Sequence, residues 1–207
     1  MKTILIANFK GGCGKTMTAI TLSGALAQQG FGVALADADV QKSSLRWLKT
    51  RPEHVATIDA LDWRKPQNIG NTPINLDYLI IDAPGSMTPE HLKQLVALSD
   101  IVVVPLQPSV FDTDSTKRFL KHLKRLKRVE KGQTSIQLVA NRLRVQTHQA
   151  DTIKAFFAHI EHTPSAIVLE RSCYETLAAQ GLSVFDVSQK PFVQIQAQWQ
   201  PLLNKLL

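Results

Sequence analysis

A glycine-rich loop near the N-terminus carries the residue types that bind phosphate. Residues 8–16 read Asn-Phe-Lys-Gly-Gly-Cys-Gly-Lys-Thr and open into a segment with helical spacing. Glycines let backbone amides curl around phosphate oxygens, and the N-terminus of the next helix adds partial positive charge. In such a loop Lys15 reaches the β- and γ-phosphates, and the Thr16 hydroxyl binds Mg²⁺. The expected nucleotide-binding set in this segment is Gly11, Gly12, Cys13, Gly14, Lys15, Thr16 and Met17.

Three carboxylates follow apolar runs further along the chain. Asp37 and Asp39 come after the run at 33–36, and Asp82 ends a longer one. Carboxylates that face a triphosphate repel it unless a cation neutralises them, which predicts Mg²⁺ close to Thr16, Asp37 and Asp82. A carboxylate at the end of a buried strand is the arrangement that holds this ion in P-loop enzymes. The alternative for Asp37 and Asp39 is that they cap the helix that follows.

The elements that must position these residues alternate between strands and helices. We expect strands at 3–8, 33–36, 55–59, 77–81, 101–105, 136–140 and 166–169, helices at 16–29, 43–49, 88–98, 113–130, 147–161, 173–180 and 191–206, and a loop at 66–75. Continuous apolar runs mark strands that are buried on both faces. The pattern predicts an α/β fold, a doubly wound, mostly parallel sheet flanked by helices, in a single domain over residues 1–207. Ligands of such folds bind beyond the carboxyl ends of the strands.

One departure from the standard phosphate loop carries a resemblance. Phe9 stands where the standard pattern has glycine, and Lys10 directly precedes Gly11-Gly12. This resembles the deviant Walker A motif of the ParA/MinD family of P-loop ATPases. The resemblance implies that Lys10 crosses a dimer interface to the phosphates bound by the other subunit. A second cation near the γ-phosphate would supply the charge stabilisation that arginine fingers give elsewhere.

The resemblance continues beyond this loop. Residues 37–41, Asp-Ala-Asp-Val-Gln, resemble the first switch of the family, and Asp39 matches the carboxylate that positions the attacking water. Val40 stands where the family usually has proline, so this loop is expected to be less stiff. Asn141 resembles the residue that reads adenine, although a turn asparagine after a strand is an equal alternative. Lys10, Lys15 and Asp39 are therefore the expected catalytic residues.

The positive charge of the chain points to a polyanionic partner. The net charge is +7, and residues 117–131 contain eight basic residues and one acidic residue. A helix here would bury an apolar face and present a basic stripe of Lys117, Lys121, Lys124, Arg125 and Arg128. Such stripes bind phosphate backbones without reading bases. The alternative is a merely solvated face. The C-terminal end, interrupted by Pro201 and poor in basic residues, is a weak candidate for a membrane-binding helix, and no apolar run is long enough to span a bilayer.

Together these features predict a ParA-like ATPase that uses ATP and Mg²⁺. It would dimerise on ATP, bind DNA non-specifically, and hydrolyse ATP slowly under stimulation by a ParB-like partner, thereby partitioning or positioning a cargo. The expected location is the cytoplasm, on the nucleoid, since two cysteines without metal-ligand spacing favour a reducing compartment. Two alternatives are a metabolic ATP-dependent synthetase resembling dethiobiotin synthetase and a nucleotide-binding adaptor that never hydrolyses ATP.

Overall fold

A seven-stranded sheet forms the centre of the molecule in the computed structural model, which describes residues 1–144 and 149–207. The strands are β1 (Lys2–Ile6), β2 (Val33–Asp37), β3 (Asp59–Asp62), β4 (Tyr78–Asp82), β5 (Ile101–Leu106), β6 (Ser135–Leu143) and β7 (Ala166–Leu169). Their order is β3-β2-β4-β1-β5-β6-β7, and every neighbouring pair is parallel. The predicted parallel sheet and fold class are confirmed.

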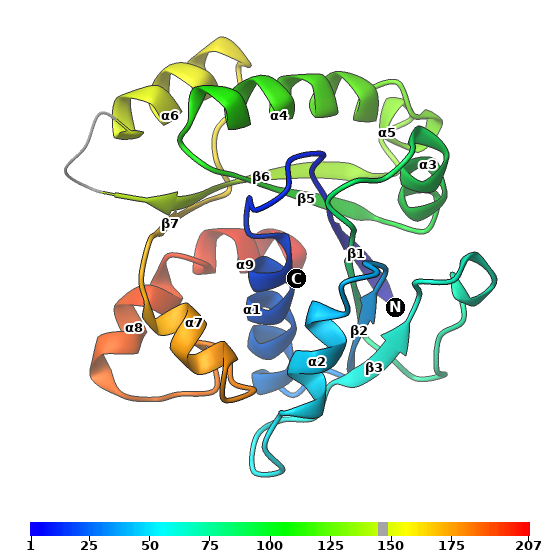
Figure 1. The fold of residues 1–207 in the computed structure, drawn as a ribbon, viewed down its shortest axis with the longest axis vertical. Coiled ribbons are helices and arrows are strands. Elements are labelled where there is room, and N and C mark those ends of the chain that lie inside the picture. The colour runs from blue at the N-terminus through cyan, green and yellow to red at the C-terminus, as the bar shows by residue number, and fades with distance from the viewer. Residues whose placement is uncertain (145–148) are drawn as a thin grey trace.

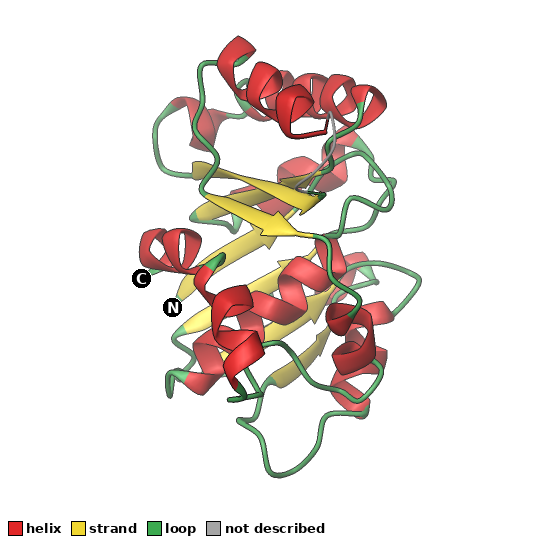
Figure 2. Cartoon of the chain, turned by 90° about the vertical axis from the view of Figure 1, so that its left-hand side faces the viewer, coloured by secondary structure: helices red, strands yellow, loops and turns green. Residues whose placement is uncertain are grey.

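Helices cover both faces of this sheet (Figures 1 and 2). One face carries α1 (Lys15–Gln28), α2 (Ser43–Lys49), α7 (Cys173–Ala178), α8 (Lys190–Ala197) and α9 (Gln200–Leu206), and the other carries α3 (Pro89–Ala97), α4 (Val110–Leu123), α5 (Lys127–Glu130) and α6 (Gln149–His159). Each layer buries its own apolar cluster. Alternate residues of one strand belong to different clusters: Ile4 packs under α1, whereas Leu5 packs under α3 and α4. This explains why the strands read as unbroken apolar runs.

Several element boundaries differ from the prediction. The strand expected at 55–59 is wrong, because Val55 lies in a turn and the strand that pairs with β2 is β3, four residues further on. The single helix expected at 113–130 is also wrong. It ends at Leu123, and the extended backbone of Leu126 (ψ 131°) separates it from α5. This break turns Leu126 and Val129 onto the apolar cluster.

The C-terminal segment divides in the same way. One helix was expected at 191–206, but α8 ends at Ala197 and α9 starts at Gln200, with Pro201 in its first turn. Proline has no N–H to donate and is favoured at a helix start, so it begins a new helix rather than continuing the old one. The loop expected at 66–75 holds only a short 3-10 turn, Pro66–Asn68. The helix expected at 147–161 begins outside the described residues, and its described part is α6.

The central strands end along one edge of the sheet and deliver the predicted site residues there. In the parallel register Asp37 lies beside Asp82, and Ile6 at the end of β1 lies beside Asp82 on the other side. The segment after β1 becomes the glycine loop, and the segment after β2 carries Asp39. Parallel pairing therefore brings together residues that are up to about 75 positions apart in sequence.

Candidate nucleotide-binding site

The phosphate loop runs from the end of β1 into the first turn of α1. Gly12 and Gly14 adopt positive φ angles of 78° and 93°, which glycine adopts without strain. A Cβ atom on Gly14 would lie 2.2 Å from Nδ2 of Asn141, so glycine is also required by the close packing of the loop against β6. The first turn of α1 contains no acidic residue, so no carboxylate lies beside its backbone amides in that turn. The loop is thus shaped as an anion cradle at a helix N-terminus.

Lys15 lies nearly buried at the base of this cradle, with 7% of its surface exposed. Its ammonium group donates a hydrogen bond to the Lys10 carbonyl oxygen at 3.1 Å, which folds the loop back over itself. The same carbonyl accepts a hydrogen bond from the Cys13 thiol at 3.2 Å. Burial, the largest effect, raises the pKa of this thiol. Cys13 is therefore a packing residue of the loop in this structure.

Side-chain amides from neighbouring strands hold the loop from behind. Asn141, a buried residue of β6, donates from Nδ2 to the Cys13 carbonyl at 3.0 Å. Gln107, just after β5, donates to the Gly12 carbonyl at 2.7 Å. Asn8 is fully buried, accepts from the Lys10 amide, and donates to the Pro105 carbonyl. These contacts fix the loop whether or not Asn141 also reads a base, which stays a prediction.

Asn8 and Gln107 were not among the predicted site residues. Asn8 also donates to the hydroxyl of Thr116 at 2.9 Å, so it joins the loop to α4. Phe9 makes a second contact of this kind, since its ring lies edge-on to Phe119 with centroids 4.8 Å apart. The sequence signal that could have identified these residues is an amide side chain directly after a buried strand, where backbone groups of the next loop need partners.

The carboxylates at the ends of β2 and β4 lie beside the loop. Asp37 is fully buried, and its oxygens accept hydrogen bonds from the amides of Asp39 and Leu45 at 2.9 and 3.0 Å. It thus shapes the turn after β2 and the start of α2, and burial raises its pKa. The contact with Leu45 agrees with the alternative that Asp37 caps the helix that follows, and its predicted role toward Mg²⁺ stays a prediction.

Asp82 is equally buried, but one of its carboxylate oxygens lacks a hydrogen-bond partner in the part of the chain that the structure describes. Its Oδ2 accepts a hydrogen bond from the Ser44 hydroxyl at 2.5 Å, whereas Oδ1 has no hydrogen-bond partner among the described residues. Burial raises the pKa of Asp82 to about 7, although the Ser44 and Thr16 hydroxyls favour its charged form and Lys15 adds to this. A buried carboxylate oxygen without a partner is costly unless a cation completes the site.

These residues fit Mg²⁺. The unpartnered Oδ1 of Asp82 and the hydroxyl of Thr16 are oxygen donors of the kind this ion takes. Across residues 1–144 and 149–207, no cluster of three or more His, Cys, Asp or Glu residues could hold a metal by itself. In nucleotide-binding enzymes Mg²⁺ usually takes only one or two protein ligands, together with water and substrate phosphates.

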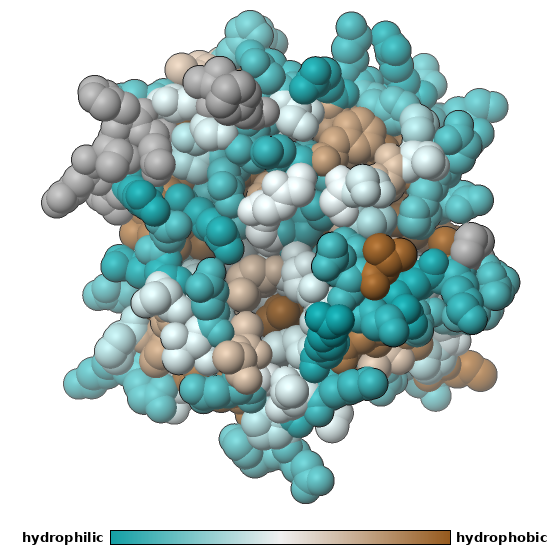
Figure 3. Space-filling view, in the orientation of Figure 1, coloured by the Kyte–Doolittle hydropathy of each residue, from teal (hydrophilic) through white to brown (hydrophobic). Residues whose placement is uncertain are grey.

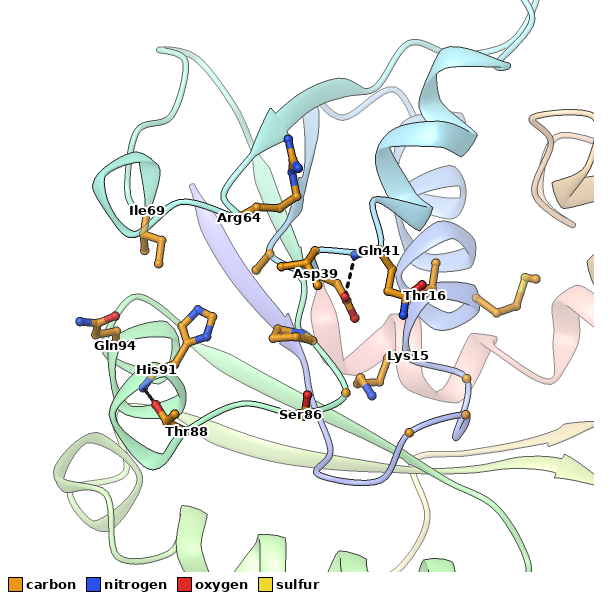
Figure 4. A pocket seen from close by; sticks show the side chains of 18 of the residues that line it. Lys15, Thr16, Asp39, Gln41, Arg64, Ile69, Ser86, Thr88, His91 and Gln94 are labelled. Atoms are coloured by element: carbon orange, nitrogen blue, oxygen red, sulfur yellow. Dashed lines mark hydrogen bonds between the residues drawn. The ribbon is translucent and has the colours of Figure 1, made fainter.

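A cavity of about 950 Å³ opens in front of these residues. The phosphate loop and Asp39 form one wall, and Thr88, His91 and Gln94 on the α3 side form the opposite wall (Figure 4). Arg64, from the segment after β3, lies on the same side as Asp39. The Asp39 carboxylate accepts a hydrogen bond from the Gln41 amide at 2.9 Å and is only partly buried. Its position on the cavity wall next to the phosphate loop suits an interaction with a group bound at the loop.

A second cavity of about 240 Å³ adjoins the first, and Met17, Arg142 and Glu175 line both. Its other walls come from Asn141, the segment after β7 and the buried Trp199. Arg142 and Glu175 form an ion pair at 3.7 Å where the two cavities meet. Together they make a trough from the phosphate loop to α7. Its volume is sufficient for a nucleotide.

The predicted basic stripe is only partly assembled. Lys121, Lys124 and Arg125 are exposed around the junction of α4 and α5. Lys117 lies 3.9 Å from Asp114 on the same helix. Arg128 is turned inward by the helix break: it donates to Thr134 and to the Ser99 carbonyl and pairs with Asp100 at 3.6 Å.

Comparisons with known proteins agree with this geometry. The family model described as the CobQ/CobB/MinD/ParA nucleotide binding domain matches residues 4–184. Maintenance of carboxysome distribution protein A of Halothiobacillus neapolitanus is 26% identical over 197 residues, which cover 91% of this chain and 88% of that protein. The chromosome-partitioning ATPase Soj of Thermus thermophilus is 30% identical over 158 residues, which cover 61% of this chain and 63% of Soj.

Solved structures show the same fold. A plasmid partition protein of Borrelia burgdorferi bound to AMPPNP superposes with a TM-score of 0.75, at 20% identity and 99% coverage of both chains. MinD of Aquifex aeolicus in complex with MinC gives a TM-score of 0.74 at 17% identity, covering 99% of this chain and 96% of MinD. The family match spans the phosphate loop, both strand-end carboxylates and Asn141. This chain therefore belongs to the CobQ/CobB/MinD/ParA nucleotide-binding domain family.

Proposed function

We propose that the chain is an ATP-driven positioning switch of the ParA type. In this proposal ATP and Mg²⁺ bind in the trough, two subunits close over the nucleotides, and the dimer binds DNA without sequence preference. Slow hydrolysis, stimulated by a partner protein, releases the dimer. The relatives reported above include proteins named for carboxysome distribution and chromosome partitioning, which supports a positioning role without naming the cargo.

The placement of Lys10 is the observation that carries this proposal. Its backbone is fixed at both the amide and the carbonyl, through Asn8 and Lys15. Its side chain is partly exposed and is not among the described residues that line the cavity of its own chain. A lysine whose backbone is fixed in this way, and whose partly exposed side chain does not line its own cavity, is suited to the phosphates of a second subunit.

The chemistry proposed for the closed site is electrostatic. Mg²⁺, when bound with the nucleotide, would neutralise charge on the phosphates. Lys15 from within the subunit and Lys10 from the partner would stabilise the charge that develops on the transferred phosphoryl group. Asp39 would orient the attacking water, because it is the partly exposed carboxylate on the cavity wall next to the loop.

DNA binding is proposed for the exposed cations around the α4–α5 junction. Figure 3 shows hydrophilic side chains along this upper edge of the molecule. Lys121, Lys124 and Arg125 are the exposed members, and Lys117 adjoins them on α4. Asn8 and Phe9 of the phosphate loop contact α4. The same helix therefore adjoins both the nucleotide site and the basic surface. Within residues 1–144 and 149–207, no helix combines the length and apolarity that crossing a bilayer requires.

The test is retardation of duplex DNA with ATP, with ADP and without nucleotide, at low and moderate salt. We expect sequence-independent binding that requires ATP and weakens as salt rises. Lys15→Ala should abolish it by removing nucleotide binding. Lys10→Ala should still bind ATP but fail to dimerise in analytical ultracentrifugation. Lys190→Ala, which removes an exposed lysine far from the site, is the matched control and should behave as wild type.

Two results would contradict the proposal. If the protein does not bind DNA under any of the three nucleotide conditions, the basic residues form a solvated face and the proposed DNA binding is wrong. If Lys10→Ala dimerises with ATP as wild type does, Lys10 has no role across the interface. Faster hydrolysis with a small soluble carboxylate, and none with DNA and partner protein, would favour a synthetase instead.

A further inference from the structure

Ser44 is a buried polar residue that none of the roles above uses. It lies in the first turn of α2 and is fully shielded from solvent. Its hydroxyl does not cap its own helix. It donates a hydrogen bond of 2.5 Å to Oδ2 of Asp82, a residue 38 positions further along the chain. Hydrogen bonds between a hydroxyl and a charged acceptor are short and strong, so this contact fixes the rotamer of the carboxylate.

The contact leaves the two oxygens of Asp82 in different situations. Oδ2 is occupied by Ser44, whereas Oδ1 is buried without a hydrogen-bond partner among the described residues. The Thr16 hydroxyl, the other predicted oxygen donor for the metal, lies near the same carboxylate and favours its charged form. One oxygen is thus held by α2, and the other is available to a cation.

We propose that Ser44 is a positioning residue, which holds the Asp82 carboxylate so that its free oxygen receives the metal ion that accompanies the nucleotide. Ser44 does not touch the metal or the phosphates. Outer partners of this kind fix the orientation of a metal ligand, and their loss usually lowers metal affinity about 10- to 100-fold.

The same contact links the metal side of the site to the loop that carries Asp39. Asp37 holds the amide of Leu45, the residue after Ser44, so adjacent residues of α2 bind the two strand-end carboxylates. Lys42, which precedes the helix in a left-handed conformation (φ 60°), provides no side-chain cap. The start of α2 is therefore held by Asp37 and Asp82, and the loop at residues 38–42 is fixed between β2 and this anchor.

Ser44→Ala tests the proposal with a readout independent of hydrolysis and of DNA. ADP affinity is measured by calorimetry in EDTA and over a Mg²⁺ titration, which separates nucleotide binding from the gain that the metal adds. We expect Ser44→Ala to bind ADP as wild type in EDTA but to need about tenfold or more Mg²⁺ to reach the same gain. Ser43→Ala is the matched control, because Ser43 is the exposed neighbour in the same turn.

Ser44→Thr tests whether the hydroxyl itself is what matters, and it can also be used if the alanine variant does not fold. It keeps the donor, so a folded threonine variant should retain the wild-type dependence on Mg²⁺. The proposal is overturned if Ser44→Ala keeps the wild-type dependence, if it weakens ADP binding equally with and without Mg²⁺, or if folded Ser44→Thr loses the dependence. None of these results decides whether the protein binds DNA, so the positioning switch proposed above stands or fails separately.

Discussion

At the scale of single residues, the buried acids of the site should make the stability of the protein depend on pH. Asp82 and Asp37 face each other at the ends of adjacent strands, and Lys15 is the cation that also acts on Asp82. Burial raises the pKa of Asp82 from 3.8 to about 7, and that of Asp37 rises for the same reason. The folded protein therefore binds protons more tightly than the unfolded chain does, and its stability falls as pH rises from about 4 to about 7.

Asp82→Asn should remove most of the decrease in stability that wild type shows as pH rises from about 4 to about 7. In EDTA, we expect the variant to be more stable than wild type near pH 7, by up to about 4 kcal/mol, and to lose this advantage near pH 4. Urea unfolding across this range measures the difference, with Asp114→Asn, an exposed acid on α4, as control. A pH-independent difference between Asp82→Asn and wild type would show that the pKa of Asp82 is the same in the folded and unfolded protein.

Gly14 allows a second test at this scale. Alanine here would need a φ of 93° and would place Cβ 2.2 Å from the Asn141 amide. Gly14→Ala should therefore cost about 1–3 kcal/mol of the free energy of unfolding and displace the loop. Gly11→Ala is the control within the same loop, since its Cβ would meet nothing within 4 Å. Equal losses for the two variants in urea unfolding without nucleotide would contradict the packing described for Gly14.

Residue types alone predicted the phosphate loop and the strand-end acids, because these residues are adjacent in sequence or directly follow an apolar run. The partners of these groups could not be found in this way. Ser44 and Asn8 bind residues far away in sequence, Asp82 and Thr116, and nothing within a few positions of either one indicates such a contact. Their roles depend on strand order and register, which are long-range properties of the fold.

At the scale of elements, a buried ion pair joins the segment directly after α2 to the segment after α7. The Arg51 and Asp186 side chains are 6% and 0% exposed, and they pair at 2.8 Å through two parallel hydrogen bonds. Arg51 also lies over the Trp47 ring. Burial opposes the charge on Asp186, but hydrogen bonds from Arg51 and the Ser183 amide outweigh it and lower its pKa.

Asp186→Asn should leave the buried guanidinium without its counter-charge. We expect a loss of about 3–5 kcal/mol in the free energy of unfolding, measured in urea at neutral pH. Asp62→Asn is the matched control, because it breaks the more exposed pair with Arg64 and should cost about 1 kcal/mol or less. A loss for Asp186→Asn no larger than that of the control would show that the segment after α2 is held by its other contacts alone.

Element boundaries were predictable where local chemistry sets them. The α2 bounds agree with the prediction, and helix α1 follows the phosphate loop and ends next to Gly30 as expected. The break after Leu123 was not predictable, because residues 117–131 have helical spacing throughout. The helix breaks here because only the bent backbone lets Leu126 and Val129 pack against the apolar cluster. The same bend moves Arg128 into contact with Asp100, so one misplaced boundary also changes the expected basic surface.

At the scale of the whole molecule, the alternation of elements predicted a parallel sheet but not its order. Apolar runs show that strands are covered on both faces, yet they do not show that β1 lies at the centre between β4 and β5. That order decides which strand ends meet, and it places Asp82 next to the phosphate loop. The net charge is also a property of the whole chain, and its functional meaning depends on where the exposed cations gather.

The salt dependence of DNA binding tests whether a local surface or the total charge is responsible. A triple variant, Lys121→Ala, Lys124→Ala and Arg125→Ala, removes exposed cations from the α4–α5 junction. A second triple variant, Lys49→Ala, Lys65→Ala and Lys190→Ala, removes the same charge from exposed positions elsewhere. Each phosphate contact contributes about 0.9 to the slope of log affinity against log salt. If the junction binds DNA, the first variant should lower this slope by about 2–3 per subunit, measured by fluorescence anisotropy with ATP, and the second should leave it unchanged. Equal reductions in both variants would mean that DNA responds to the overall charge, and that the α4–α5 junction is not its binding surface.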